Sequence, residues 1–304
     1  MGSAIKADNL TKQFGKLRAV GNLTLDVPEG SIYAFLGPNG AGKTTTIKLL
    51  MNIIRPTEGS SSVLGVDSGK LAPDNWRQIG YVSENQKMPE WMTVDAFLKY
   101  CRPMYPNWDD DLCAKLLKRF DLPLNQKLSA MSRGMKVKAA LLSSLAYRPR
   151  LLVLDEPFTG LDPLVRDEFI RGILELTESE HWTIFVSTHD IGEVEQLADW
   201  VGIIDRGELK LSEKLEVLQA RFRKIEITSE MPMESLPEFH GHWLLPEHQG
   251  RVTTFIETQY ECGKTESLIQ PLFPNGAIAA KEMTLREIFV ALAKTYTKNQ
   301  GGKE

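Results

Sequence analysis

A glycine-rich segment between an apolar run and a helical pattern constrains the fold more than any other feature. The run Ile32–Leu36 is continuous and apolar, as expected of a strand covered on both faces, and residues 45–53 are typical of a helix. Between them, residues 37–44 read G-P-N-G-A-G-K-T and match every fixed position of a phosphate-binding loop. An ordinary glycine-rich turn is the alternative, which the flanking strand and helix disfavour.

The residue types of this loop suit phosphate binding. Glycines let backbone N–H groups approach phosphate oxygens, and the helix N-terminus favours the same anion. Lys43 adds a positive charge for the β- and γ-phosphates, and the hydroxyl of Thr44 can ligate Mg²⁺. The nucleotide-binding residues expected here are Gly37, Pro38, Asn39, Gly40, Ala41, Gly42, Lys43, Thr44 and Thr45.

A pair of carboxylates follows a second buried strand. Leu151–Leu154 is apolar and runs into Asp155 and Glu156. A carboxylate at the C-terminal end of a parallel strand faces the ligand crevice. Asp155 is expected to hold Mg²⁺ through water, and Glu156 to orient or deprotonate an attacking water. Alone, such a pair is more often a solvated strand end, but the phosphate loop reverses that preference.

The pattern along the chain alternates strands and helices. The first 65 residues have mostly strand character, and three helical patterns lie between about 88 and 148. This predicts an α/β, phosphate-loop NTPase fold with a parallel core sheet, an N-terminal antiparallel β subdomain, a helical insertion and a small C-terminal α+β appendage. We expect a nucleotide-binding domain over 1–220 and an accessory domain over 221–304.

Composition narrows the class of protein. Lys+Arg number 36 and Asp+Glu 40, so the net charge is −4. This acidic balance disfavours binding of nucleic acid as the main function. The 3 cysteines are too few for a disulfide framework or zinc site and suit a reducing compartment. We find no signal-peptide core and no apolar run near 18 residues, so a membrane role would need another polypeptide.

Further motifs resemble the nucleotide-binding domain of the ATP-binding cassette (ABC) family over about residues 3–220. Met131-Ser-Arg-Gly-Met135 stands where that family has its LSGGQ signature, and Gly160-Leu-Asp162 resembles the D-loop. His189 follows a buried strand and resembles the switch histidine, while Phe14 stands at the adenine-stacking aromatic. The colinear order of these motifs makes the resemblance specific.

The resemblance implies roles for residues that have ordinary alternatives. Ser132 and the Gly134 amide would contact the γ-phosphate of the ATP held by a partner subunit, although Ser132 alone would be a helix N-cap. His189 would act at the γ-phosphate rather than being structural, and Phe14 would stack on adenine rather than lie in the core. Asp162 would contribute to the nucleotide site, and ATP with Mg²⁺ would be the cofactors.

Three positions depart from the pattern of the family. The third signature position is Arg133 instead of glycine, and the fifth is Met135 instead of glutamine. The Q-loop glutamine is replaced by Glu84, which can still serve as a catalytic residue and metal ligand but adds negative charge near ATP. Gln86 is the alternative residue for this role.

The family resemblance implies an ATP-hydrolysing motor subunit of a transporter, of exporter type. Two cassettes, identical or different, would close on two ATP molecules and drive a separate transmembrane permease at the inner face of the cell membrane. Trp91, in the segment 88–92, would anchor that permease near Glu84, or else cover the insertion's core. The ending 283–290 and the stretch 105–108 are similar to segments of bacterial exporter ATPases.

A non-transport ABC ATPase acting on nucleic acid or ribosomes is the alternative function. Repair types carry a long coiled coil, and no sustained heptads occur in this sequence. Ribosome-associated types carry two cassettes, whereas this sequence has one phosphate loop. The acidic balance disfavours both, so no nucleic acid partner is expected. A phosphate-loop kinase would have no reason for the signature at Ser132.

Overall fold

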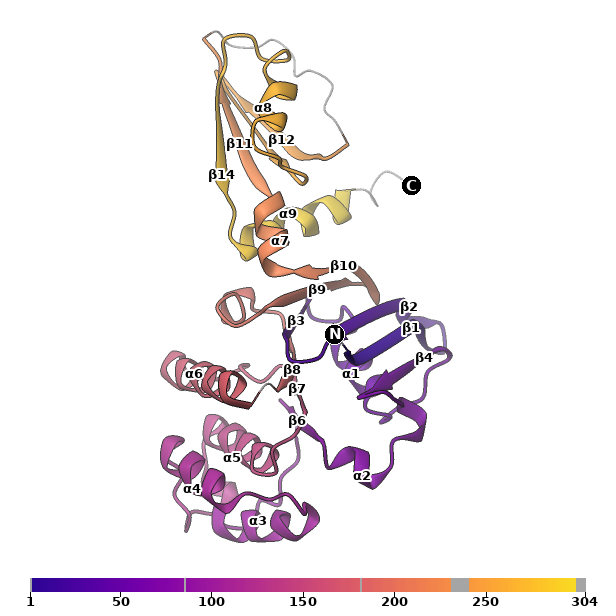
Figure 1. The fold of residues 1–304 in the computed structure, drawn as a ribbon, viewed down its shortest axis with the longest axis vertical. Helices are drawn as coiled ribbons and strands as arrows, with labels where there is room; N and C mark the ends of the chain where they lie inside the picture. Colours follow the sequence, from indigo (N-terminus) through magenta and orange to yellow (C-terminus); the bar gives the residue numbers. More distant parts are fainter. Residues whose placement is uncertain (1, 85, 181, 231–240, 299–304) are drawn as a thin grey trace. The chain divides into compact units, whose positions relative to one another are not determined.

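In the computed structural model, described over residues 2–84, 86–180, 182–230 and 241–298, the chain divides into two units. The first spans Met1–Ser212 and the second Glu213–Glu304. Figure 1 colours them from indigo to yellow along the sequence. We describe each unit by itself.

The centre of the first unit is a six-stranded sheet of order β10-β9-β3-β8-β7-β6. Its pairs β9–β3, β3–β8, β8–β7 and β7–β6 are parallel, which confirms the predicted parallel core. Every residue of β3, β7 and β8 is buried, as the apolar runs indicated. The strands are β3 (Ile32–Leu36), β6 (Ile79–Ser83), β7 (Leu151–Asp155), β8 (Thr183–Thr188), β9 (Trp200–Asp205) and β10 (Glu208–Lys214).

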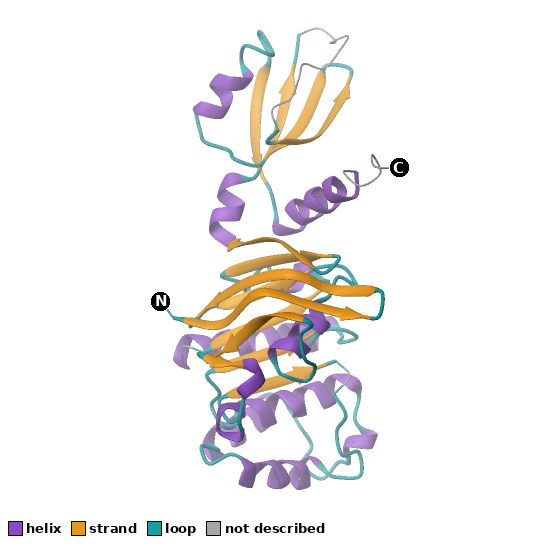
Figure 2. Ribbon diagram, turned by 90° about the vertical axis from the view of Figure 1, so that its right-hand side faces the viewer, coloured by secondary structure: helices purple, strands orange, loops and turns teal. Residues whose placement is uncertain are grey.

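A second, antiparallel sheet of order β2-β1-β4-β5 forms the predicted N-terminal β subdomain. Its strands are β1 (Ser3–Phe14), β2 (Leu17–Pro28), β4 (Glu58–Val63) and β5 (Val66–Asp67). Buried side chains such as Ile5 and Leu23 share one hydrophobic core with Phe35 and Phe185 of the parallel sheet. Figure 2 shows these strands in orange. The shared core fixes the two sheets against each other.

Six α-helices lie in the described part of the first unit. They are α1 (Lys43–Leu50), α2 (Pro73–Trp76), α3 (Val94–Cys101), α4 (Asp110–Arg119), α5 (Arg133–Leu145) and α6 (Pro163–Glu180), with 3₁₀ turns η1 (Ser68–Lys70), η2 (Arg102–Met104), η3 (Leu128–Ala130) and η4 (Ile191–Glu193). Helix α1 begins two residues before the predicted start at 45 and ends before 53, because Asn52 adopts a left-handed φ of 49°.

The predicted helical insertion consists of α3, α4 and α5, grouped together in Figure 1. Each helix begins at a side chain that accepts a hydrogen bond from the first turn: Thr93 from the Ala96 N–H at 3.2 Å, and Asp109 from the Leu112 N–H at 2.8 Å. Ser132 caps α5 in the same way. These caps fix where the three helices begin. In the sequence, α5 lies between β6 and β7, with the signature segment at its start.

The second unit is the predicted α+β appendage. Its antiparallel sheet has the order β12-β13-β11-β14, and its core includes Ile225, Trp243, Phe255 and Phe273. The elements are α7 (Leu215–Arg221), β11 (Arg223–Thr228), β12 (Trp243–Gln249), β13 (Val252–Glu257), α8 (Lys264–Ile269), β14 (Ala277–Glu282) and α9 (Leu285–Lys298).

The sequence pattern predicts strands over 224–228 and 251–257 and a helix over 283–296, which correspond to β11, β13 and α9. It does not predict α7, β12, α8 or β14. Strand β12 contains Pro246, and β14 is alanine-rich and almost fully exposed, so neither shows the usual alternation of a half-buried strand. Residues 232–240 of the stretch 232–250, which contains His, Pro and Gly, lie outside the described residues. Across the described residues, no helix is both long and apolar enough to cross a membrane.

Candidate nucleotide site

The phosphate loop connects the end of β3 to the start of α1. Gly40 and Gly42 adopt left-handed φ values of 80° and 108°. A Cβ atom at Gly42 would lie 2.6 Å from the carbonyl oxygen of Ala19, and one at Gly37 would lie 2.4 Å from that of Ile204. The backbone therefore has no room for side chains at these two positions.

Lys43 is buried and turns its ammonium back over the loop. Its Nζ donates to the carbonyl oxygen of Gly37 at 2.6 Å and to that of Pro38 at 3.2 Å. The same atom forms an ion pair with Oε1 of Glu156 at 3.0 Å. Lys43 thus connects the phosphate loop to the carboxylate at the end of β7.

Asp155, at the end of β7, meets two hydroxyl groups. Thr44 donates to its Oδ1 at 3.0 Å, and Ser187, on β8, donates to the same oxygen at 2.7 Å. Burial raises the pKa of Asp155, while the bonds from Ser187 and Thr44 oppose that shift. The structure therefore brings together Thr44 and Asp155, both predicted as metal ligands. Ser187 was not predicted, because a serine at a strand end has no motif of its own.

Glu156 is held on both carboxylate oxygens. Oε1 faces Lys43, while Oε2 lies 2.8 Å from Nδ1 of His189 and 3.4 Å from Oγ1 of Thr159. An ionised carboxylate only accepts hydrogen bonds, so the contact assigns the proton to Nδ1 of His189. Glu156 also adopts a left-handed φ of 52°, and its N–H donates to the Ser187 carbonyl at 3.0 Å. Two of the three predicted catalytic residues, Glu156 and His189, are therefore in contact.

Glu84 follows β6 and lies beside the same strand ends. Its N–H donates to the carbonyl oxygen of Asp155 at 3.0 Å, and its carboxylate forms an ion pair with Arg133. Gln86 instead turns its amide oxygen toward the N–H of Ser83 at 3.4 Å. Of the two sequence alternatives, Glu84 is the one that lines the cavity described next.

A cavity of about 570 Å³, a size typical of small-molecule sites, is lined by Lys43, Thr44, Glu84 and Glu156 of this group. Phe14 lines it and is 49% exposed, and Nζ of Lys12 lies 5.0 Å from the centre of its ring. Two cations that sequence reasoning missed, Arg18 and Arg206, also line it, because neither belongs to a motif. The predicted residues on its wall are Phe14, Asn39, Gly40, Gly42, Lys43, Thr44, Thr45, Glu84 and Glu156.

Eight predicted residues do not line this cavity: Gly37, Pro38, Ala41, Ser132, Gly134, Asp155, Asp162 and His189. Ser132 is exposed and uses its hydroxyl to cap α5, accepting from the Met135 N–H at 3.2 Å. Gly134 follows it, and a Cβ there would meet Leu161 at 3.4 Å. Asp162 is exposed and caps α6. The separation of Ser132 and Gly134 from the cavity agrees with action on another subunit's nucleotide, which stays a prediction.

Comparison with known proteins gives the family. A family model described as "ABC transporter" matches residues 20–159. The bacitracin transport ATP-binding protein BcrA of Bacillus licheniformis is 31% identical over 299 residues, covering 96% of this chain and 98% of BcrA. The chain belongs to the ABC transporter ATP-binding proteins. It is therefore an ATPase that uses ATP and Mg²⁺ and works with a second cassette and a separate permease.

Other relatives agree with this family. The lantibiotic transport ATP-binding protein SrtF of Streptococcus pyogenes is 34% identical, covering 70% of this chain and 91% of SrtF. A solved ATP-binding subunit of an ABC transporter has a TM-score of 0.66 at 26% identity, covering 72% of this chain and 92% of that subunit. The dimeric ABC transporter cassette MJ0796 has a TM-score of 0.63 at 25% identity, covering 69% and 98%.

The donor set of this ABC ATPase fits Mg²⁺. The described residues contain no group of three or more His, Cys, Asp or Glu side chains that could hold a metal alone. The hydroxyl of Thr44 and the carboxylate of Asp155 already share one hydrogen bond, and Glu84 lies on the same cavity. Mg²⁺ is commonly held by one or two protein oxygens together with substrate phosphates and water. Thr44, Asp155 and Glu84 supply such a small number of protein oxygens.

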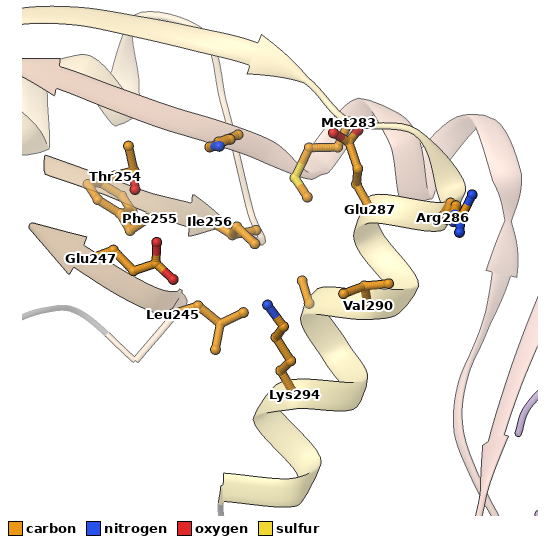
Figure 3. A pocket seen from close by; sticks show the side chains of 12 residues that line it. Leu245, Glu247, Thr254, Phe255, Ile256, Met283, Arg286, Glu287, Val290 and Lys294 are labelled. Carbon is orange, nitrogen blue, oxygen red and sulfur yellow. The ribbon is translucent and has the colours of Figure 1, made fainter. Parts of the chain in front are cut away.

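The second unit contains a separate cavity of about 360 Å³, shown in Figure 3. The side chains of Leu245, Ile256, Met283 and Val290 give it an apolar wall between the sheet and α9, and Lys294 reaches in from α9. None of the predicted nucleotide-site residues lines it.

The bond from Ser187 gives a pH prediction. Binding of Mg²⁺ requires an ionised Asp155. Replacing Ser187 by Ala removes a hydrogen bond that lowers the pKa of Asp155, so that pKa should rise. The acid limb of Mg²⁺-dependent nucleotide binding should then move to higher pH. Titration with a fluorescent nucleotide across pH measures this shift. Ser143→Ala is the control, since the hydroxyl of Ser143 donates to the carbonyl of Ala140 and not to Asp155. An unmoved acid limb would contradict the assignment.

Proposed function

We propose that this ABC ATPase drives an exporter. The observation that carries the proposal is the match to BcrA, which spans 96% of the chain and so includes both units. SrtF is named for lantibiotic transport, and YbhF of Escherichia coli, at 32% identity, is named as a probable multidrug ABC transporter protein; cargoes of this kind support export. We propose that 221–304 serves this motor as an accessory domain.

The proposed catalytic residues are those that the structure clusters at the strand ends. Glu156 orients and deprotonates the attacking water, while His189 holds its carboxylate through Oε2. Lys43 binds the phosphates after leaving Glu156. Bound Mg²⁺ would supply charge neutralisation on the phosphate oxygens. Thr44, Asp155 and Glu84 would hold that ion, and Phe14 would stack on adenine.

The burial of Glu156 between Lys43 and His189 supports a role as general base, and removing such a base typically lowers the rate by about 10² to 10⁴. Glu156→Gln should lower ATP hydrolysis by that factor while ATP affinity stays near that of the parent. Steady-state turnover and equilibrium nucleotide binding measure the two quantities. Glu168→Gln, at an exposed carboxylate on α6, is the matched control. Turnover of Glu156→Gln within a few-fold of the parent would refute the role.

Lys43 and Ser132 lie in different places, so their substitutions should impair different steps. Lys43 lies on the cavity, whereas Ser132 is exposed at the start of α5. Lys43→Ala should weaken ATP binding to the monomer, because it removes the ammonium at the phosphate loop. Ser132→Ala should spare monomer binding but reduce ATP-dependent dimerisation and hydrolysis. ATP titration at protein concentrations too low for dimerisation measures the affinity of the monomer, and light scattering measures ATP-dependent dimerisation. An equal loss of monomer affinity in both variants would exclude action across the dimer.

We propose that the chain is cytoplasmic and binds the inner face of the membrane through the permease. The proposed docking surface spans about residues 84–120. Trp91 lies within it, after Glu84 and before α3. Trp91 is 74% exposed, which disfavours its alternative interpretation as a core residue. Large exposed aromatic side chains are frequent anchors of protein interfaces.

Trp91→Ala should release the protein from membranes without changing ATP affinity or the unfolding temperature, since an exposed side chain adds little to the core. Co-expression with the cognate permease followed by membrane fractionation measures the release. Leu268→Ala, at an exposed leucine of the second unit, is the control for loss of apolar surface. Unfolding of Trp91→Ala would restore the core interpretation, and recovery of the wild-type chain with ribosomes or DNA would favour the non-transport class.

A further inference from the structure

The two departures from the family pattern that bear opposite charges contact each other. Glu84 replaces the Q-loop glutamine, and Arg133 replaces a signature glycine. Although 49 residues apart, they form an ion pair between Nη2 of Arg133 and Oε1 of Glu84. Neither a glutamine nor a glycine would form such a pair, so the two substitutions have a joint structural consequence.

The pair connects the nucleotide cavity to the signature helix. Glu84 lines the cavity, and its backbone is bonded to Asp155. Arg133 is the first residue of α5 and directly follows the N-cap Ser132. Its guanidinium also lies over Gly160, where a Cβ would come within 2.7 Å of Nη1. One side chain therefore contacts both Glu84 and the loop that follows Glu156.

The charges of the site explain why Glu84 needs a cation. Asp155, Glu156 and Glu84 bring three carboxylates to neighbouring strand ends, and the ammonium of Lys43 pairs with Glu156. Arg133 is the cation that pairs with Glu84. A metal ion bound with nucleotide would supply the same compensation, because a carboxylate favours any nearby positive charge.

The exposure of the pair argues against a role in folding. The side chain of Glu84 is 29% exposed and that of Arg133 is 45% exposed. Ion pairs with this much access to water contribute little to stability, and many contribute nothing measurable. Nucleotide binding at the cavity is therefore a more informative quantity to measure than the stability of the fold.

We propose that Arg133 and the Mg²⁺ of the nucleotide compete for the carboxylate of Glu84, so that Arg133 sets the Mg²⁺ concentration needed for nucleotide binding. Arg133 is a positioning residue: it pairs with the carboxylate of Glu84, which would otherwise be available to hold the metal. The inference rests on the proposed role of Glu84 as a metal ligand.

The test is the Mg²⁺ dependence of binding of a non-hydrolysable fluorescent ATP analogue, which does not depend on turnover. Arg133→Gln should lower the Mg²⁺ concentration at half-saturation by about twofold to fivefold, the upper part of the range that one exposed ion pair supports. Arg133→Lys should remain close to the parent. Glu84→Gln should raise the Mg²⁺ requirement, and adding Arg133→Gln to it should cause no further change.

Lys136→Ala is the matched control, since it removes a positive charge from the same helix and breaks a different pair, with Glu90 at 2.7 Å. It should leave the Mg²⁺ requirement unchanged. An unchanged Mg²⁺ requirement in Arg133→Gln, or additive effects in the double variant, would overturn the inference while leaving the ATPase function intact. Failure of the parent chain to bind the analogue with Mg²⁺ would instead refute the proposed site itself.

Discussion

The buried ion pair between Lys43 and Glu156 is the interaction on which the site depends. The side chain of Lys43 is 4% exposed and that of Glu156 10% exposed. A buried charge without a partner is costly, and breaking such a pair destabilises a protein strongly. Each residue therefore requires the other to be in place. This holds the phosphate loop against the end of β7, at the position where phosphate oxygens would exchange with the carboxylate.

The order of the strands makes this contact possible. Strand β8 lies between β3 and β7, so the C-terminal ends of three parallel strands meet at one edge of the sheet. The phosphate loop, the Asp155–Glu156 pair and the Ser187–His189 segment follow these three strands. The apolar strands supply a rigid base, and the polar groups at their ends satisfy one another. The site is therefore a product of the sheet topology rather than of any one loop.

Sequence reasoning predicted most of this site because its residues belong to motifs at strand ends. The spacing of the phosphate loop predicted one group of site residues, and the carboxylates after an apolar run predicted another. It did not predict Ser187, which is an unremarkable strand residue until the neighbouring strand is known, nor the contact of Arg133 with Glu84, which depends on how the insertion folds back. In the second unit, β14 was missed because an exposed, alanine-rich strand is defined by its backbone pairing with β11 rather than by its pattern.

The most direct test of the central claim is a structure of this chain with Mg²⁺ and a non-hydrolysable ATP analogue. The account predicts that Nζ of Lys43 leaves Glu156 for a phosphate oxygen, while Thr44 and Asp155 face the metal and Glu156 keeps its contact with His189. A structure in which Lys43 still pairs with Glu156, with the analogue bound elsewhere, would contradict the account.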